Sequence, residues 1–285
     1  MADPSPSQAG RIVLVATPIG NLDDLSPRAV AALSAADVVA AEDTRRTGRL
    51  LAHLGLRRPL VRYDDHTEGR SADLVDRAAA GETVAVATDA GTPGISDPGY
   101  VLVRAAVDRG VAVELIPGPV AAIHALVLSG LPPDRFVFDG FLPRRSAQRR
   151  EHLAALRDEP RTFVCYLSPH RVADELDDLA AVLGARPAAL ARELTKLHEQ
   201  ILRSPLDELA ATVRRDGVRG ELTLVVAGAP PPPAVTDDDI TDRVGALLAR
   251  GVTTRDAVAR VVRETGAGRR RVYELALRAR DDAGT

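Results

Sequence analysis

Short apolar runs rich in Val, Ile and Ala alternate along most of this chain with longer Ala- and Leu-rich segments of helical periodicity. Such alternation is typical of an α/β protein, in which helices cover a mostly parallel sheet. Ser26 suits the N-cap of the first helix and Pro27 its first position. Strands are expected at residues 11–17, 37–41, 60–63, 83–88 and 111–116, and helices at residues 27–35, 45–54, 71–80 and 100–109.

A second cycle of strands and helices follows, with expected helices at 120–129, 147–157, 171–183 and 206–214 and expected strands at 135–141, 161–167, 188–193, 198–203 and 221–227. Beyond a proline-rich linker, three short helices at 240–250, 254–264 and 269–280 are separated by glycines, as in a helix-turn-helix unit. A length of 285 residues suits two domains and a small extra unit. The predicted division is a disordered tail at 1–10, α/β domains at 11–118 and 119–229, a linker at 230–235 and a helical unit at 236–285.

The composition excludes several classes of protein. The net charge of −3 is not that of a polycation, so any nucleic-acid binding must come from local basic patches. Cys165 is the only cysteine, which excludes an internal disulfide framework. The N-terminal residues contain no apolar leader, and prolines interrupt the longest uncharged run, residues 115–133, so we expect a cytoplasmic protein.

Three turns rich in Gly and Pro directly follow expected strands, at residues 16–21, 89–99 and 116–120. In parallel α/β sheets ligands bind beyond the carboxyl ends of the strands. Glycine allows a ligand to approach the backbone, and proline stiffens the loop. The three turns together predict a preformed pocket that is lined by main-chain groups.

The common ligand motifs are missing from these turns. No G-x-G-x-x-G follows an expected strand, and a phosphate-binding G-x-x-x-x-G-K-[ST] is impossible because the only lysine, Lys196, follows a threonine. No H-E-x-x-H is present and the histidines are scattered, so no metal site is expected. No G-x-S-x-G hydrolase elbow occurs either.

Several longer strings resemble the tetrapyrrole-methylase superfamily of enzymes that use S-adenosylmethionine (SAM), and most closely its ribosomal branch. They are VATPIGNLDDLSPRA (15–29), AEDTRRTGRLL (41–51), ATDAGTPGISDPG (87–99), IPGPVAA (116–122), FDGFLPRR (138–145), YLSPHR (166–171) and ARELTKLHE (191–199). The sequence departs from the family at Leu167, where relatives usually have Glu, and at Val120, where a small hydroxyl residue is frequent.

The resemblance implies two α/β domains with SAM bound in the cleft between them, and a homodimer. It also implies methylation of the 2'-hydroxyl of a cytidine, at position 1402 in bacterial numbering, in the 16S rRNA of the small ribosomal subunit. The implied contacts to SAM are mostly small or apolar, which suits main-chain recognition and packing against adenine. By alignment they are Pro18, Ala90, Gly91, Thr92, Ile95, Val120, Ala121, Leu167 and Leu194.

A ribose hydroxyl is a poor nucleophile near neutral pH, so a base, or a charge that lowers its pKa, assists its attack. Lys196 is the only lysine in a chain whose other strongly basic residues are all arginine, which in practice cannot lose its proton. Desolvation beside Arg192 would lower the pKa of Lys196 and allow it to accept the proton. The competing candidates are Asp43, His66 and Glu193.

Arginines at strand ends and helix starts are the candidate RNA contacts, although a charge run is more often a solvated face. The candidates are Arg45, Arg46, Arg144, Arg145, Arg149, Arg150 and Arg171. Two other functions stay open, because a fold does not settle a substrate. One is SAM-dependent methylation of a small molecule such as a precorrin. The other is a non-catalytic, SAM-binding, ribosome-associated protein.

Overall fold

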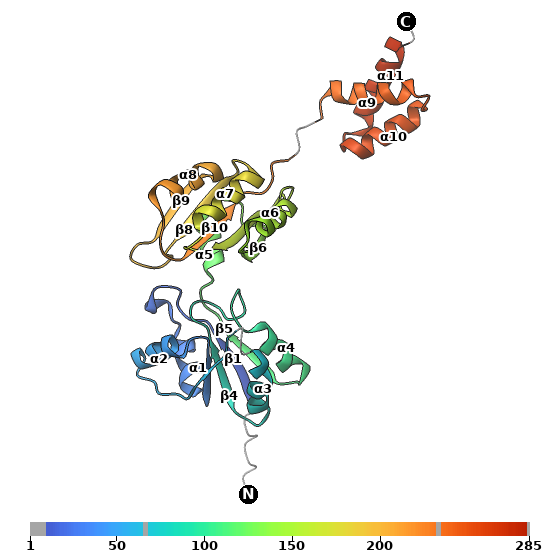
Figure 1. Cartoon of the computed structure of the whole chain (residues 1–285). Helices are drawn as coiled ribbons and strands as arrows, with labels where there is room; N and C mark the ends of the chain where they lie inside the picture. The colour runs from blue at the N-terminus through green and yellow to red at the C-terminus, as the bar shows by residue number, and fades with distance from the viewer. Residues whose placement is uncertain (1–9, 65–67, 232–234, 284–285) are drawn as a thin grey trace. The chain divides into compact units, whose positions relative to one another are not determined.

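The computed structural model describes residues 10–64, 68–231 and 235–283. It divides into a compact unit, Met1–Ala229, and a second unit, Pro230–Thr285, and each is described by itself (Figure 1). The predicted disordered tail lies almost wholly outside the described residues, as does the middle of the predicted linker. The predicted boundary between two domains at 118/119 stays a prediction.

The first half of the larger unit is a sheet of five parallel strands in the order β3-β2-β4-β1-β5. Its elements are β1 (Arg11–Val15), η1 (Leu22–Asp24), α1 (Pro27–Ala35), β2 (Val38–Ala41), α2 (Thr44–His53), β3 (Leu60–Arg62), η2 (Glu68–Arg70), α3 (Ser71–Ala79), β4 (Thr83–Ala87), α4 (Tyr100–Asp108) and β5 (Ala112–Ile116). The predicted parallel sheet is confirmed for this half. Helix α1 has the predicted bounds, and Ser26 caps it by accepting a hydrogen bond from the Ala29 N–H.

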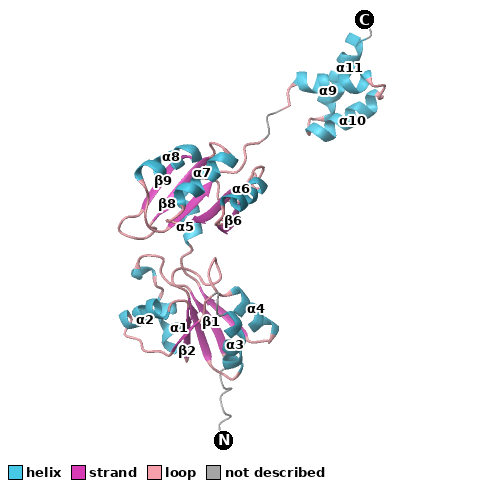
Figure 2. Cartoon of the chain, viewed as in Figure 1, coloured by secondary structure: helices cyan, strands magenta, loops and turns pink. Residues whose placement is uncertain are grey.

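Helices cover both faces of this sheet, as the flanking cyan helices in Figure 2 show. In β1, Ile12 and Leu14 face the core formed with α3 and α4, whereas Val13 and Val15 face the core formed with α1 and α2. A strand that is buried on both faces reads as a continuous apolar run. This is why the central strands were plain in the sequence.

The second sheet has the order β6-β7-β10-β8-β9 and is mixed. Only β6 and β7 pair in parallel, while β10 runs antiparallel to β7 and β8, and β9 antiparallel to β8. The alternation of elements did not predict these directions. Helices α6, α7 and α8 cover one face and α5 the other. The bounds are α5 (Ala121–Ser129), β6 (Phe136–Phe141), α6 (Ser146–Ala155), β7 (Thr162–Leu167), α7 (Val172–Leu183), β8 (Pro187–Arg192), β9 (Gln200–Pro205), α8 (Leu206–Asp216) and β10 (Leu222–Val226).

The smaller unit contains α9 (Asp237–Ala249), α10 (Thr254–Thr265) and α11 (Arg269–Ala283), packed around their own apolar core. Helix α9 begins three residues before its predicted start, because Thr236 and Asp239 form a capping box that extends it. Gly266 ends α10 in the left-handed conformation. Within the described ranges of the chain, no helix is long and apolar enough to cross a membrane.

Candidate functional site

The three Gly/Pro-rich turns meet at the carboxyl ends of the first sheet. Thr17 and Gly91 exchange two backbone hydrogen bonds, of 2.9 and 3.0 Å, which join the first turn to the second. The Thr92 hydroxyl donates to the Pro119 carbonyl at 3.1 Å and joins the second turn to the third. Gly91 has a φ of +86°, which favours glycine, and a Cβ there would lie 3.4 Å from the Pro119 oxygen.

These turns form one wall of a cavity of about 240 Å³, which we call the first cavity. The other wall comes from the ends of the second sheet, including Tyr166, Leu167 and Thr223. Seven of the nine residues expected to contact SAM line this cavity: Ala90, Gly91, Thr92, Ile95, Val120, Ala121 and Leu167. Pro18 lines a neighbouring cavity instead. Leu194 is buried in an apolar cluster and lines neither of the two.

Sequence reasoning missed an aromatic and acidic corner of the first cavity, formed by Tyr166, Phe141 and Asp97. The Tyr166 ring lies 5.3 Å from that of Phe141 and 5.2 Å from that of Phe138. Burial raises the pKa of Tyr166, and the negative charge of Asp97 raises it further. In a chain with only 3% aromatics, two Phe and one Tyr on neighbouring strands were the available signal.

A second cavity of about 320 Å³ adjoins the first and shares Ile19, Ala90 and Glu221 with it. Its lining is more polar. One face of α2 contributes Arg46, Thr47, Arg49, Leu50 and His53, and the opposite wall contributes Pro18, Gly20 and Lys196.

Lys196 lies between two carboxylates at the edge of this second cavity. Its Nζ donates to Glu193 at 3.0 Å and to Glu221 at 2.9 Å. Burial lowers the pKa of Lys196, but the hydrogen bonds and charges of Glu221 and Glu193 outweigh burial and raise it. The predicted lowered pKa is therefore wrong. Arg192, the expected neighbour, donates instead to the Arg219 carbonyl.

The other candidate bases also have partners. Glu193, at a φ of +51°, accepts hydrogen bonds from the Glu221 N–H and from Lys196, and both lower its pKa. Asp43 caps α2 and accepts from the side chain and backbone of Arg45, which hold its pKa far below the usual range. Asp43 lines neither cavity. His66 lies outside the described residues.

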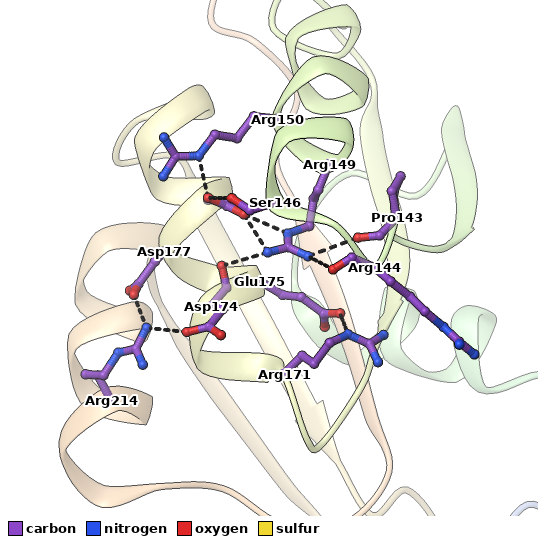
Figure 3. Close-up of polar contacts among 11 residues, drawn as sticks. Pro143, Arg144, Ser146, Arg149, Arg150, Arg171, Asp174, Glu175, Asp177 and Arg214 are labelled. Carbon is purple, nitrogen blue, oxygen red and sulfur yellow. Dashed lines mark hydrogen bonds and ion pairs between the residues drawn. The ribbon is translucent and has the colours of Figure 1, made fainter.

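The arginine cluster at 144–150 is partly structural. Arg149, with 3% of its side chain exposed, donates to Asp178 at 2.9 Å and to the carbonyls of Pro143 and Arg144 (Figure 3). Its predicted role as an RNA contact is therefore wrong. The buried face was visible in the sequence, because Leu153 follows Arg149 by four residues on the same face of α6.

The remaining candidate arginines reach the surface, and some of them form ion pairs with carboxylates of this chain. Arg144 and Arg145 are exposed at the start of α6. Arg150 pairs with Asp178, Arg45 with Asp43, and Arg46 with Asp89 at 3.3 Å. Arg171 pairs with the buried Glu175 (Figure 3). Glu175 also accepts from the Ser168 N–H and so holds the Ser-Pro-His-Arg turn.

Comparison with known proteins agrees with this architecture. The family model of the tetrapyrrole (corrin/porphyrin) methylases matches residues 11–210. A protein named ribosomal RNA small subunit methyltransferase I from Synechocystis is 44% identical over 96% of this chain and 99% of its own length. The protein of the same name from Mycobacterium tuberculosis is 47% identical over 97% of this chain and 98% of its own length. The protein of the same name from Escherichia coli is 44% identical over 94% of this chain and 95% of its own length.

Solved structures with lower identity share the fold. Diphthine synthase has a TM-score of 0.58 at 17% identity and covers 76% of this chain and 89% of its own. Uroporphyrin-III C-methyltransferase from Thermus thermophilus, complexed with S-adenosyl homocysteine, has a TM-score of 0.56 at 23% identity. It covers 76% of this chain and 97% of its own. At such identities the likeness establishes the fold alone.

Proposed function

Because the chain belongs to the tetrapyrrole methylase family, and within it to the ribosomal RNA small subunit methyltransferase I group, we propose that it methylates the ribose 2'-hydroxyl of a cytidine in 16S rRNA. Membership makes the chain a SAM-dependent methyltransferase. The observation that carries the rRNA substrate is the extent of the match. Identity of 44–47% covers nearly the whole chain, including the C-terminal helical unit, and not only the methylase fold.

We place SAM in the first cavity. Its lining suits the cofactor, because small residues expose turn backbone to polar groups while Ile95, Val120 and Leu167 offer an apolar surface to an adenine. The carboxylate of Asp97 supplies a negative charge toward a cationic ligand. When bound, SAM supplies a methyl group on a sulfonium sulfur, which is its own leaving group.

We place the acceptor ribose in the second cavity, beside the shared residues Ile19, Ala90 and Glu221. An acceptor held there lies next to the first cavity, because the two cavities share these residues, and methyl transfer requires the hydroxyl to reach the methyl group in line with its bond to sulfur. Lys196, kept protonated by its two carboxylates, uses two of its three N–H donors on them and has one left to donate to the acceptor oxygen. Its positive charge favours the developing alkoxide, and the proton that the hydroxyl loses passes to solvent water, so we assign Lys196 an electrostatic role in place of the base role.

A homodimer fits the surface of the larger unit. Helix α5 is apolar apart from His124 and Ser129, and its Ile123, Val127 and Leu128 side chains remain exposed. Leu115, on the edge strand β5, is exposed as well. Exposed apolar patches of this kind usually mark protein interfaces. We therefore propose that a second copy covers this region. A cytoplasmic location stays a prediction.

The deciding experiment is methyl transfer from labelled SAM to small ribosomal subunits purified from a strain that lacks this protein. The RNA is then digested and its nucleosides are identified by mass spectrometry. We expect a gain of 2'-O-methylcytidine at one site. Methylation at a base, or at another nucleoside, would contradict the proposed atom or nucleotide while leaving the enzyme class intact.

The same experiment separates the other functions. SAM binding without transfer to subunits, but with transfer to a precorrin, would favour the small-molecule methylase, whose fold the solved structures share. SAM binding without transfer to either acceptor would favour the non-catalytic protein. Leu167 is buried and lines the first cavity without a charge, which is the departure that made this third function worth testing.

A further inference from the structure

One face of α2 carries basic side chains for which the chemistry assigned so far has no use. Arg46, Arg49 and His53 recur at helical spacing and line the second cavity together. Leu51, by contrast, is buried on the face that packs against the sheet. The basic face therefore points into the same space in which we place the acceptor.

The charges in this cavity are unevenly compensated. Lys196 is matched by Glu193 and Glu221, and Arg46 by Asp89. The side chains of Arg49 and His53 form no hydrogen bond or ion pair with any part of the chain that the structure describes. Arg49 therefore offers an uncompensated guanidinium at the cavity wall, and His53 an imidazole beside it.

The position of α2 is well defined relative to the cofactor turn. The Asp43 N–H, just before the helix, donates to Asp89 at 3.1 Å, and the Asp89 N–H donates to Glu42 at 3.1 Å. Asp89 begins the turn that lines the first cavity through Ala90, Gly91 and Thr92. A guanidinium on α2 is therefore held in a set relation to the place of methyl transfer, as a binding residue requires.

We propose that Arg49, assisted by His53, binds the phosphodiester next to the ribose that is methylated. This assignment rests on the proposed function. The 2'-hydroxyl and the 3'-phosphate are attached to neighbouring carbons of one ribose. Any site that delivers the hydroxyl to the cofactor must therefore accommodate that phosphate close by. Arginine matches phosphate with two parallel N–H donors, so the free guanidinium of Arg49 is the fitting group.

The test compares Arg49→Gln, Arg49→Lys and the double variant Arg49→Gln/His53→Gln with the control Arg57→Gln. Arg57 is an exposed arginine that lines neither cavity. The probes are SAM itself and small ribosomal subunits from a strain that lacks this protein. Subunit affinity is measured over a series of KCl concentrations, together with SAM affinity and the kcat and KM of methyl transfer.

We expect Arg49→Gln to weaken subunit binding about tenfold, as for a lost charge-assisted hydrogen bond. The slope of log affinity against log salt should fall by about 1, because one phosphate contact is lost. SAM affinity should not change. Arg49→Lys keeps the charge and should retain most of the salt slope, the double variant should bind more weakly still, and Arg57→Gln should behave as the unaltered protein.

Two results would overturn the assignment in distinguishable ways. If the unaltered protein methylates subunits and Arg49→Gln matches Arg57→Gln in affinity and salt slope, Arg49 holds no phosphate and the proposed function stands. If the unaltered protein transfers no methyl group to subunits, the proposed function fails and this assignment fails with it.

Discussion

Lys196 shows how the neighbours of a side chain decide its chemistry. The sequence marks it as the only lysine, and its position near a strand end suggested a proton acceptor. In the structure two carboxylates surround the ammonium and raise its pKa, so it stays charged at neutral pH. For this reason we propose an electrostatic role for Lys196 in place of the base role.

This role predicts a difference between two substitutions. Lys196→Gln removes the charge and should lower kcat by about 10²-fold, the usual cost of losing one oxyanion-stabilising donor. Lys196→Arg keeps the charge and should retain a measurable part of kcat. The measurement is single-turnover transfer to subunits with SAM saturating. Equal loss in both variants, with unchanged SAM affinity, would restore the base role.

Removal of Arg149 should lower the stability of the protein. Its guanidinium is buried against Asp178, and Arg149→Ala leaves that carboxylate with only Arg150 and Ser146 as partners. Breaking a buried ion pair from one side costs about 3 kcal/mol of unfolding free energy. Urea unfolding of the whole protein checks this. Arg145→Ala, at an exposed position one turn earlier, should change stability by less than about 0.5 kcal/mol.

At the scale of elements, the turns that follow the strands of the first sheet line the first cavity. Their backbone hydrogen bonds bring together residues 17, 91, 92 and 119, which belong to three separate loops. Gly91 and Gly94 share a φ of +86° in the same turn, but only Gly91 lines the first cavity. Substitutions at these two positions therefore impose the same left-handed φ, but only the one at position 91 also alters the lining of the first cavity.

We expect Gly91→Ala to weaken SAM binding about tenfold more than Gly94→Ala does. Both variants incur the same left-handed strain, of order 1 kcal/mol. A Cβ at position 91 would also stand against Ile19 and the Pro119 carbonyl, whereas one at position 94 meets nothing within 4 Å. Isothermal titration with SAM measures both. Equal SAM affinities in the two variants would contradict the placement of SAM in the first cavity.

At the scale of the whole molecule, the apolar surface of α5 bears on assembly. Val127 is 68% exposed on a mostly apolar helix. A charge at this position should leave the monomer folded but should destabilise an interface that buries it. We expect Val127→Asp to convert a dimer into monomers in sedimentation equilibrium. Tyr273→Asp, at an exposed position in the C-terminal unit, serves as the control. A monomeric unaltered protein would contradict the proposal directly.

Local patterns determined much of this protein. Apolar runs placed the strands, Ser26 and Pro27 set the start of α1, and Gly and Pro marked the turns that line the first cavity. These features depend on neighbours along the chain, so a single sequence contains them. The quoted strings also pointed to the family.

Only the tertiary structure decided the strand directions of the second sheet, the partners of Lys196 and the burial of Arg149. Glu221 meets Lys196 from 25 residues away, and Asp178 meets Arg149 from 29. Charges act through space, and the pairing of distant segments sets the distance between them. Periodicity along the chain cannot report that distance, and for this reason the side chains were found from the sequence but their roles were not.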